Sequence, residues 1–183
     1  QIDDKVKILR RGARVVDLGA APGGWTQVAV ERCGRTGRVV AVDIAEMADV
    51  PGAVVLRGDV CEPATLDQVR TALDGPADVV LSDMAAPATG HAATDHLRIV
   101  ALVEIAAEFA EQVLAPGGAF VAKVLLGGTE SHLLARLKRS FTRVRHVKPP
   151  ASRSDSAEMY VVATGFRGAA MPPIPGHPGV PVS

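Results

Sequence analysis

The chain has 183 residues, of which 48% are hydrophobic and 3% aromatic, and its 20 basic residues equal its 20 acidic residues. This length fits one domain with a sizeable core, while a net charge of zero favours neither an acidic nor a basic partner. No apolar run approaches the roughly 20 residues that span a bilayer and the chain begins without a signal-peptide pattern, so we expect a cytoplasmic protein with no membrane partner.

Short apolar runs alternate with amphipathic stretches along most of the chain. Strands are predicted at RVVDLGA (14–20), GRVVAVDI (37–44), AVVLRGDV (53–60), ADVVLSDM (77–84), AFVAKVL (119–125), RVRHVKP (143–149) and AEMYVVATGF (157–166). Helices are predicted at GWTQVAVERC (24–33), ATLDQVRTALD (64–74), DHLRIVALVEIAAEFAEQVL (95–114) and ESHLLARLKRSF (130–141). This alternation indicates an α/β fold with a mostly parallel, seven-stranded sheet and helices on both faces. No helix separates the last two strands, so the last one should be antiparallel to its neighbour.

Polar residues stand at or near the predicted ends of successive strands, namely Asp17, Asp43, Asp59, Asp83 and Lys123. In a doubly wound sheet, ligands bind at the carboxyl ends of the strands, close to the point where strand order reverses. An acid that closes the second strand, here Asp43, can accept hydrogen bonds from both ribose hydroxyls of a nucleoside. Each aspartate alone could instead cap the next helix, but the series together favours a ligand site.

The loop GAAPGGW (19–25) follows the first strand and offers glycines where a ligand must approach the backbone closely. It lacks both the GxGxxG pattern of NAD enzymes and the GK[ST] of a phosphate-binding loop, and Asp17 would repel a pyrophosphate. A cationic ligand with a nucleoside end and an amino-acid end fits better, and S-adenosylmethionine is such a molecule. We expect the aspartates to hold its adenosine and Gly19 and its neighbours to admit its methionine part.

Six segments resemble, in order and spacing, the FtsJ-type ribose 2′-O-methyltransferases: VVDLGAAPGGWTQ, GRVVAVDI, GDV, VLSDMAAPATG, LAPGGAFVAKVL and SRSDSAEMYVVATGF. The resemblance covers residues 2–167 and implies a Rossmann-like fold dependent on S-adenosylmethionine. It implies methyl transfer to a uridine ribose of 23S ribosomal RNA in the large ribosomal subunit. In the family, the cofactor is held by residues that match Gly23, Trp25, Asp43, Asp59 and Asp83. A Lys-Asp-Lys-Glu set assists the reaction, and its last three members match Asp83, Lys123 and Glu158.

The first lysine of that set has no match. In the family it precedes the first strand, and the alignment places Ile2 in the helix that follows it. Lys7 lies too close to the strand, and Lys5 falls on the other side of the same short segment. We therefore expect residues 1–166 to form a methyltransferase domain that lacks an N-terminal segment. Residues 167–183, rich in proline and glycine, are expected to be a disordered tail.

Attack of a ribose hydroxyl on a sulfonium methyl is an in-line displacement by a weak nucleophile, which must be held close and partly relieved of its proton. Lys123 could direct the lone pair of the hydroxyl or accept its proton. Asp83 and Glu158 would favour the charged lysine, so we favour an orienting role over a neutral base. The structural alternatives are a snorkelling edge lysine at Lys123, a solvated edge-strand carboxylate at Glu158 and an ordinary core residue at Trp25.

A basic stretch predicts where RNA binds. Residues 131–154 contain seven basic residues and no acid. We take six of the seven as phosphate ligands: Arg136, Arg139, Arg143, Arg145, Lys148 and Arg153. Two arginines before the first strand, Arg10 and Arg11, are added to them. The scarcity of aromatic residues argues against a reader of splayed single-stranded bases and favours a structured RNA.

Three functions remain open at this point. The first is ribose methylation of ribosomal RNA, and the second is the same chemistry on tRNA, for which the wider family has similar motifs. The third is a non-catalytic nucleotide- or RNA-binding module, against which the combination of Asp83, Lys123 and Glu158 argues. We expect no metal, because His91 and His96 have no partner at a metal-ligand spacing. We also expect the protein to be a monomer.

Overall fold

The computed structural model describes residues 7–85, 89–125, 129, 131–149 and 158–168. Three of the sequence predictions therefore lie outside the described residues. They concern the N-terminal segment with Ile2 and Lys5, the phosphate ligand Arg153, and the tail from residue 169 onward.

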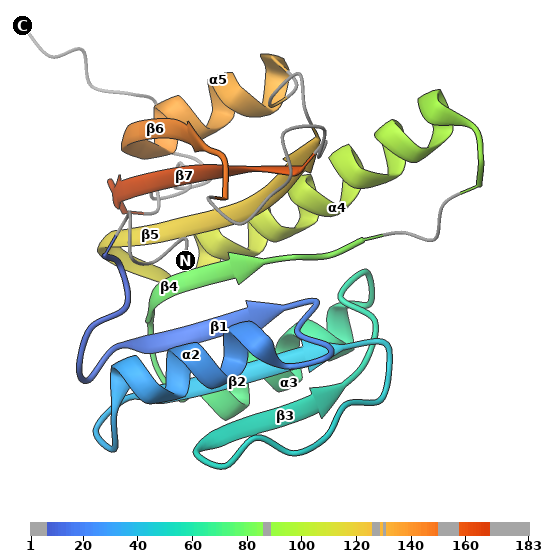
Figure 1. Cartoon of the computed structure of the whole chain (residues 1–183). Coiled ribbons are helices and arrows are strands. Elements are labelled where there is room, and N and C mark those ends of the chain that lie inside the picture. Colours follow the sequence, from blue (N-terminus) through green and yellow to red (C-terminus); the bar gives the residue numbers. More distant parts are fainter. Residues whose placement is uncertain (1–6, 86–88, 126–128, 130, 150–157, 169–183) are drawn as a thin grey trace, which may run out of the picture.

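Seven strands form one sheet in the order β3-β2-β1-β4-β5-β7-β6 (Figure 1). The strands are β1 (Arg14–Leu18), β2 (Arg38–Asp43), β3 (Ala53–Arg57), β4 (Ala77–Ser82), β5 (Leu114–Leu125), β6 (Phe141–Val147) and β7 (Glu158–Phe166). Strands β1 to β5 are parallel to their neighbours within this group, and β7 is antiparallel to both β5 and β6. The predicted fold class, including the antiparallel last strand, is confirmed.

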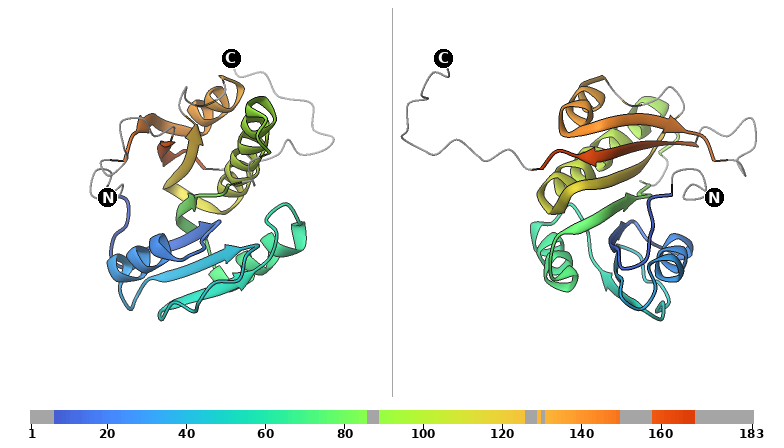
Figure 2. Two further views of the ribbon diagram at one scale, coloured as in Figure 1. Left: turned by 45° about the vertical axis from the view of Figure 1, so that its right-hand side comes forward. Right: turned by 90° about the vertical axis from the view of Figure 1, so that its left-hand side faces the viewer.

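Helices cover both faces of the sheet, as Figures 1 and 2 show. The helices are α2 (Gly24–Cys33), α3 (Pro63–Leu73), α4 (Ala92–Val113) and α5 (Ser131–Ser140). The buried residues of α3, α4 and α5 belong to one apolar cluster and those of α2 to another, so α2 lies alone on its face among the described helices. No described helix is long and apolar enough to cross a membrane.

Helix α4 and strand β5 both begin earlier than the sequence predicts. Helix α4 begins at Ala92, three residues early, and Asp95 in its first turn accepts hydrogen bonds from the backbone and hydroxyl of Thr89. Strand β5 begins at Leu114, because this residue already pairs with Ala77 before a register irregularity carries the chain past its glycines. The segment LAPGG thus joins the sheet instead of forming only a loop.

The central strands are buried on both faces, which explains their nearly continuous apolar runs. Val15 and Val16 are both fully buried although they point to opposite faces of β1. The larger apolar cluster packs Phe109 and Phe120 between the sheet and α3, α4 and α5. This rigid centre fixes the carboxyl ends of β1 and β4, between which the strand order reverses. Ligands bind at such a switch point in doubly wound sheets.

Truncation of Phe120 tests the role of this core. Phe120→Ala removes a fully buried ring from β5 and should lower the free energy of unfolding by about 3–5 kcal/mol, since it loses apolar burial and leaves a cavity. Leu97→Ala is the control, because Leu97 is 68% exposed on α4 and its truncation should change stability by less than about 0.5 kcal/mol. Urea unfolding of both variants measures the difference, and equal losses would contradict the assignment of the core.

Candidate active site

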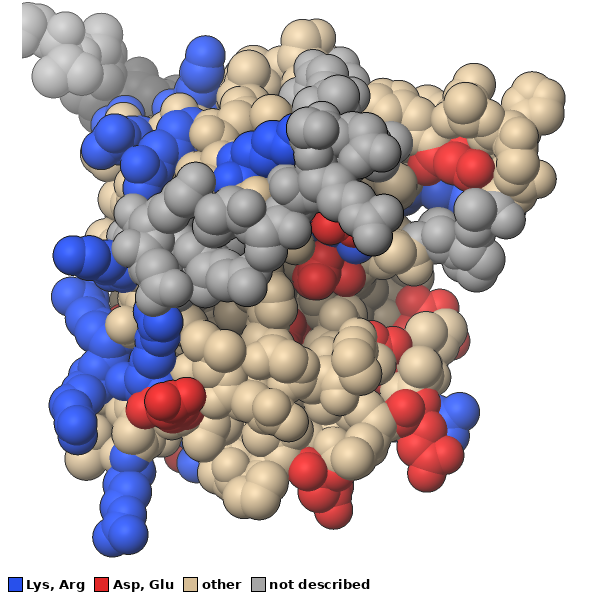
Figure 3. All heavy atoms as spheres, viewed as in Figure 1, with Lys and Arg blue, Asp and Glu red and all other residues tan. Residues whose placement is uncertain are grey.

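The predicted polar residues gather at the carboxyl edge of the sheet. Asp43 ends β2, Asp83 directly follows β4, and Asp59 follows β3 by two residues. Asp17 and Lys123 lie just inside the ends of β1 and β5. In Figure 3, acidic side chains collect towards this edge on the right, whereas basic side chains line the opposite edge on the left. The site is therefore acidic and lies at the switch point.

Three of these predictions meet in one ion-pair cluster. Lys123 Nζ lies 3.1 Å from Asp83 Oδ1 and 3.9 Å from Glu158 Oε1. The lysine side chain is 19% exposed, and Glu158 is 54% exposed at the start of β7. Because β7 lies between β5 and β6, Glu158 does not belong to an edge strand. A half-buried ammonium flanked by two carboxylates can hold a hydroxyl group that enters from solvent.

Tyr160 is a site residue that the sequence analysis missed. It pairs with Lys123 across β5 and β7, and its ring stacks on Trp25 with centroids 5.3 Å apart. Burial raises the pKa of its phenol, and the nearby charges of Asp83 and Glu158 raise it further, so the hydroxyl stays protonated. The spacing Glu-x-Tyr would have placed both side chains on one face of a strand. Trp25 is half-buried in this stack and helps to close the apolar cluster under α2.

The glycines of the loop have different roles. Gly19 has φ +72°, and a Cβ there would lie 2.6 Å from Met84 Cγ, so this glycine is required by close packing of the chain on itself. Its backbone N–H donates to Val42 O at 2.9 Å, which ties the loop to β2. A Cβ on Gly24 would meet nothing within 4 Å. Space for a ligand is therefore found at the end of the loop, not at its beginning.

Gly23 and the first turn of α2 leave backbone donors available. Gly23 is the N-cap residue, with φ +117° and no side-chain cap, and the first turn of the helix holds no acidic residue. The first N–H groups of a helix have no partner within it and, with the helix dipole, attract an anion. This end of α2 can therefore receive a carboxylate, such as that of an amino acid.

Asp43 and Asp59 both bind backbone amides. Asp43 Oδ2 accepts from the N–H of Ala21 at 2.9 Å and its Oδ1 from the N–H of Ala45 at 2.8 Å. Asp59 Oδ1 accepts from the N–H of Cys61 at 2.9 Å. Neither aspartate is the N-cap of a helix, since Gly23 and Glu62 hold those positions. Carboxylate oxygens accept more than one hydrogen bond, so these contacts fix the side chains and leave capacity for a ligand.

Ile44 follows Asp43 and is another residue that the sequence analysis did not single out. Its side chain is 66% exposed beside the acids of the carboxyl edge. An apolar side chain next to the acid that closes the second strand can cover the flat face of a base.

Asp17 differs from the other aspartates because it is completely buried. Its Oδ2 accepts from the hydroxyl of Thr26 at 2.7 Å, and its Oδ1 has no hydrogen-bond partner among the described residues. Burial raises the pKa of Asp17 to about 7, against the lowering effect of Thr26, and the charges of Asp83 and Asp43 add to the rise. The predicted cofactor ligand thus lies beneath the loop as a carboxyl group with one unsatisfied oxygen.

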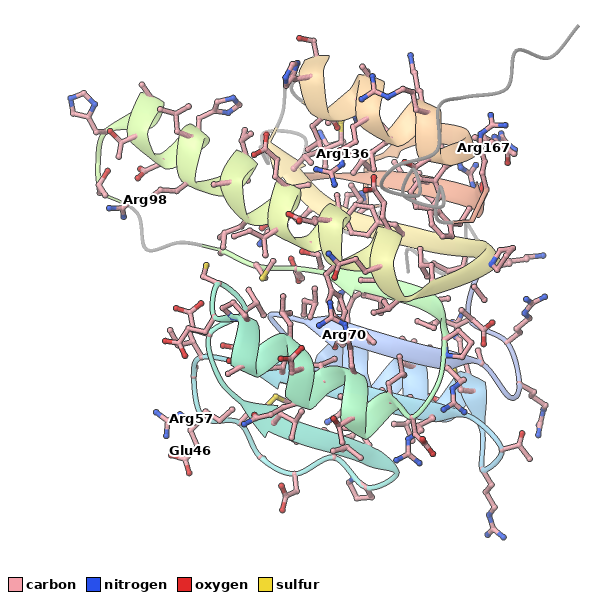
Figure 4. All side chains as sticks on the ribbon, turned by 180° about the vertical axis from the view of Figure 1, so that it is seen from behind. Glu46, Arg57, Arg70, Arg98, Arg136 and Arg167 are labelled. Carbon is pink, nitrogen blue, oxygen red and sulfur yellow. The ribbon has the colours of Figure 1, made fainter. Side chains whose placement is uncertain are left out.

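The predicted RNA ligands occupy different faces. Arg136 on α5 makes a two-point contact with Glu111 of α4, with Nη2 at 2.7 Å from Oε2 and Nε at 3.0 Å from Oε1. Figure 4, seen from behind, shows Arg136 where α5 faces α4. Its carboxylate partner comes from another helix, so an inspection of residues 131–154 alone could not show it. A phosphate would have to displace this carboxylate, and we leave Arg136 out of the RNA surface.

Arg143 and Arg145 lie on the other side of the sheet. Arg145 pairs with Val162, whose side chain belongs to the cluster on the α2 face, and Arg143 projects to the same face by the alternation of the strand. Neither has a carboxylate partner among the residues that the structure describes. Lys123 is on this face too, since it follows Val121 of the same cluster by two residues.

The remaining predicted phosphate ligands lie in three different places, and Arg139 is on the opposite face of the sheet. Lys148 directly follows β6, and Arg139 is exposed in the last turn of α5. Arg10 and Arg11 are exposed and precede β1, which places them at the amino edge of the sheet, away from Lys123. The predicted basic residues are therefore not one continuous patch.

The doubly wound sheet, the glycine loop after β1 and the acids at its carboxyl edge define a Rossmann-like methyltransferase. The model of the FtsJ-like methyltransferase family matches residues 1–166, and the chain belongs to this family. The resemblance seen in the sequence is confirmed.

Similar proteins agree with this assignment. The chain is 62% identical over 174 residues to the ribosomal RNA large subunit methyltransferase E of Paramagnetospirillum magneticum, covering 92% of this chain and 71% of that protein. The protein of the same name from Azorhizobium caulinodans is 58% identical, with 93% and 72% covered. The crystal structure of a ribosomal RNA methyltransferase from Plasmodium falciparum superimposes with a TM-score of 0.79 at 27% identity, covering 91% of this chain and 93% of that one.

The buried Asp17 should make stability depend on pH. A carboxyl group whose folded pKa is about 7 disfavours folding once it must ionise. The contribution of Asp17 to stability should therefore be present in full below about pH 4 and be lost as pH rises through 7. Asp17→Asn should remove this loss, worth a few kcal/mol because one pKa unit corresponds to about 1.4 kcal/mol. Unfolding of both proteins in urea between pH 5 and 8 measures it. A stability difference between them that does not change with pH would contradict the protonated state.

Proposed function

We propose that this protein transfers a methyl group from S-adenosylmethionine to a ribose 2′-hydroxyl of ribosomal RNA, with a uridine of the 23S RNA as the expected target. The observation that carries the proposal is the Lys123–Asp83–Glu158 cluster at the switch point of a methyltransferase fold. Ribosomal RNA as the substrate follows from relatives that are 54–62% identical and named ribosomal RNA large subunit methyltransferase E.

The described residues fit this cofactor. The uncapped end of α2 suits its carboxylate, and Asp43, at the end of β2, suits its ribose hydroxyls. Asp59 and Ile44 lie near the position that the adenine would take next to this ribose, and the negative charge of Asp83 would favour the cationic sulfonium. When bound, the cofactor supplies an electrophilic methyl group on a sulfonium. The orphaned oxygen of Asp17 and the open position at Gly24 are features that a cationic amino-acid ligand would satisfy.

Lys123 is the residue that would act on the substrate hydroxyl. Its Nζ is held by Asp83 on one side and Glu158 on the other, which favours the ammonium form and fixes its direction. A charged Nζ donates a hydrogen bond to the hydroxyl oxygen, aligns a lone pair for in-line attack and stabilises the negative charge that develops there. Tyr160, the cross-strand neighbour of Lys123, remains a neutral phenol, and the stacking of its ring on Trp25 holds both rings in place beside the lysine.

Methyl transfer measures this proposal directly. Labelled S-adenosylmethionine is incubated with large ribosomal subunits, free 23S RNA or tRNA, and the modified nucleotide is mapped. We expect label in ribosomal RNA, at a ribose. Label only in tRNA would support the alternative substrate, and binding without transfer to any RNA would support the non-catalytic module.

The catalytic role of Lys123 predicts a specific defect. Lys123→Ala should keep the fold and the cofactor affinity but slow single-turnover methyl transfer by at least about 100-fold, the usual range for loss of such a group. Lys138→Ala is the matched control, because this lysine is exposed on α5 on the other face of the sheet. A Lys123→Ala rate within a few-fold of that of the parent would show that the mechanism is wrong.

The RNA is expected to lie across the α2 face of β5, β7 and β6. Lys123 lies on this face of β5, while Arg143 and Arg145 lie on it two strands away on β6. Among the described residues no helix covers this part of the sheet, and Arg143 is exposed and Arg145 partly exposed there. The protein would act as a monomer in the cytoplasm, where the ribosomal subunit is assembled.

Reversal of charge on the two faces separates their contributions. Arg143→Glu with Arg145→Glu should weaken RNA binding and reduce the slope of log affinity against log salt by about 2, because two phosphate contacts are lost. Lys138→Glu with Arg139→Glu makes the same charge change on α5 and should have a smaller effect. Filter binding at several salt concentrations measures both, and equal slopes for the two double variants would contradict this orientation.

A further inference from the structure

We propose that Asp17 carries a proton in the free protein and releases it to solvent when S-adenosylmethionine binds. This buried carboxyl group would then help the protein to distinguish the cofactor, which has a positively charged sulfur, from the product S-adenosylhomocysteine, whose sulfur is neutral. This inference rests on the proposed function, because it takes the cofactor from there. It gives Asp17 a role in the selectivity of binding for cofactor over product, in addition to its role as a predicted cofactor ligand.

Among the residues that the structure describes, no cation forms an ion pair with Asp17 that would keep it ionised. Its register neighbours Ala41 on β2 and Leu81 on β4 are buried and apolar. Helix α2 contributes only the hydroxyl of Thr26, which satisfies one of the two carboxyl oxygens. An ionised carboxylate with an unsatisfied oxygen in such a place is costly, whereas a protonated carboxyl group is not.

The charged groups around it are mostly of the same sign. Asp43 ends β2 on one side and Asp83 follows β4 on the other, and both disfavour a further negative charge at Asp17. Lys123 of β5 is ion-paired with Asp83 and Glu158, so its charge is already engaged. The pKa of Asp17, raised by burial to about 7, means that the group is poised to change charge near neutral pH.

A bound cation reverses this balance. S-adenosylmethionine has a sulfonium, an ammonium and a carboxylate and brings one net positive charge, which favours the ionised form of Asp17. The bond that breaks is the O–H bond of the Asp17 carboxyl, and the proton passes to the buffer. S-adenosylhomocysteine has the same ammonium and carboxylate but a neutral thioether, so it should displace fewer protons. Cofactor affinity should therefore rise with pH more steeply than product affinity.

Calorimetry in buffers of different ionisation enthalpy counts the protons. At pH 7 we expect binding of S-adenosylmethionine to release about half a proton per site and S-adenosylhomocysteine clearly less. Asp17→Asn should keep the contact with Thr26 and abolish the difference between the two ligands. Asp78→Asn is the matched control, because Asp78 accepts from the N–H of Arg14 at the opposite end of β1 and should leave the proton count unchanged.

A second variant guards against poor folding of Asp17→Asn. Thr26→Val removes the hydrogen bond that favours the ionised carboxylate, so the pH range of proton release should move upward. Equal proton counts for cofactor and product in the parent, or an unchanged difference in Asp17→Asn, would overturn the inference while leaving the proposed function intact. Failure of the parent to bind S-adenosylmethionine at all would overturn both.

Discussion

The reversal of strand order between β1 and β4 is the constraint on which the site depends. The chain builds β1, β2 and β3 towards one edge and then returns to place β4 and β5 on the other side of β1. The loops that leave β1 and β4 therefore turn in opposite directions, and the space between them stays open. Their contact is close all the same, because Gly19 packs on Met84 and the N–H of Asp83 donates to Leu18 O at 3.1 Å. This contact fixes Asp83, which in turn fixes Lys123.

The electrostatics of the site follow from the same geometry. Parallel strands bring all of their carboxyl ends to one edge, so aspartates that are distant in sequence become neighbours there. Such a collection of like charges disfavours the folded state unless a cation or a proton compensates it. Lys123 compensates for Asp83 and Glu158, and protonation compensates at Asp17. The carboxyl edge, with Asp43 and Asp59 beside these groups, is thus complementary to a cationic ligand.

Much of this could be predicted from the sequence, because hydrophobic alternation and loop composition are local properties. The strand-end positions of Asp43, Asp59 and Asp83 and the presence of Lys123 beside them needed only the order of the strands and the parallel sheet. What could not be predicted depends on contacts between distant segments. Arg136 looked free because its partner Glu111 lies on another helix. The complete burial of Asp17, and hence its protonation, depends on how α2 packs over β1.

One face of the sheet carries the larger part of the apolar core, and the other carries the reactive lysine. Helices α3, α4 and α5 bury the larger apolar cluster, and their ion pair between Arg136 and Glu111 joins two helices on that side. On the other face α2 covers only β1 and its neighbours, which leaves β5, β7 and β6 without a helix among the described residues. Lys123, Arg143 and Arg145 all project there. A polyanion that approaches the lysine would therefore cross a surface on which the positive charges of the two arginines offset its negative charge. Under the proposed function, the basic residues on the open face would attract the RNA and so bring its backbone to the side of the sheet from which Lys123 is reached.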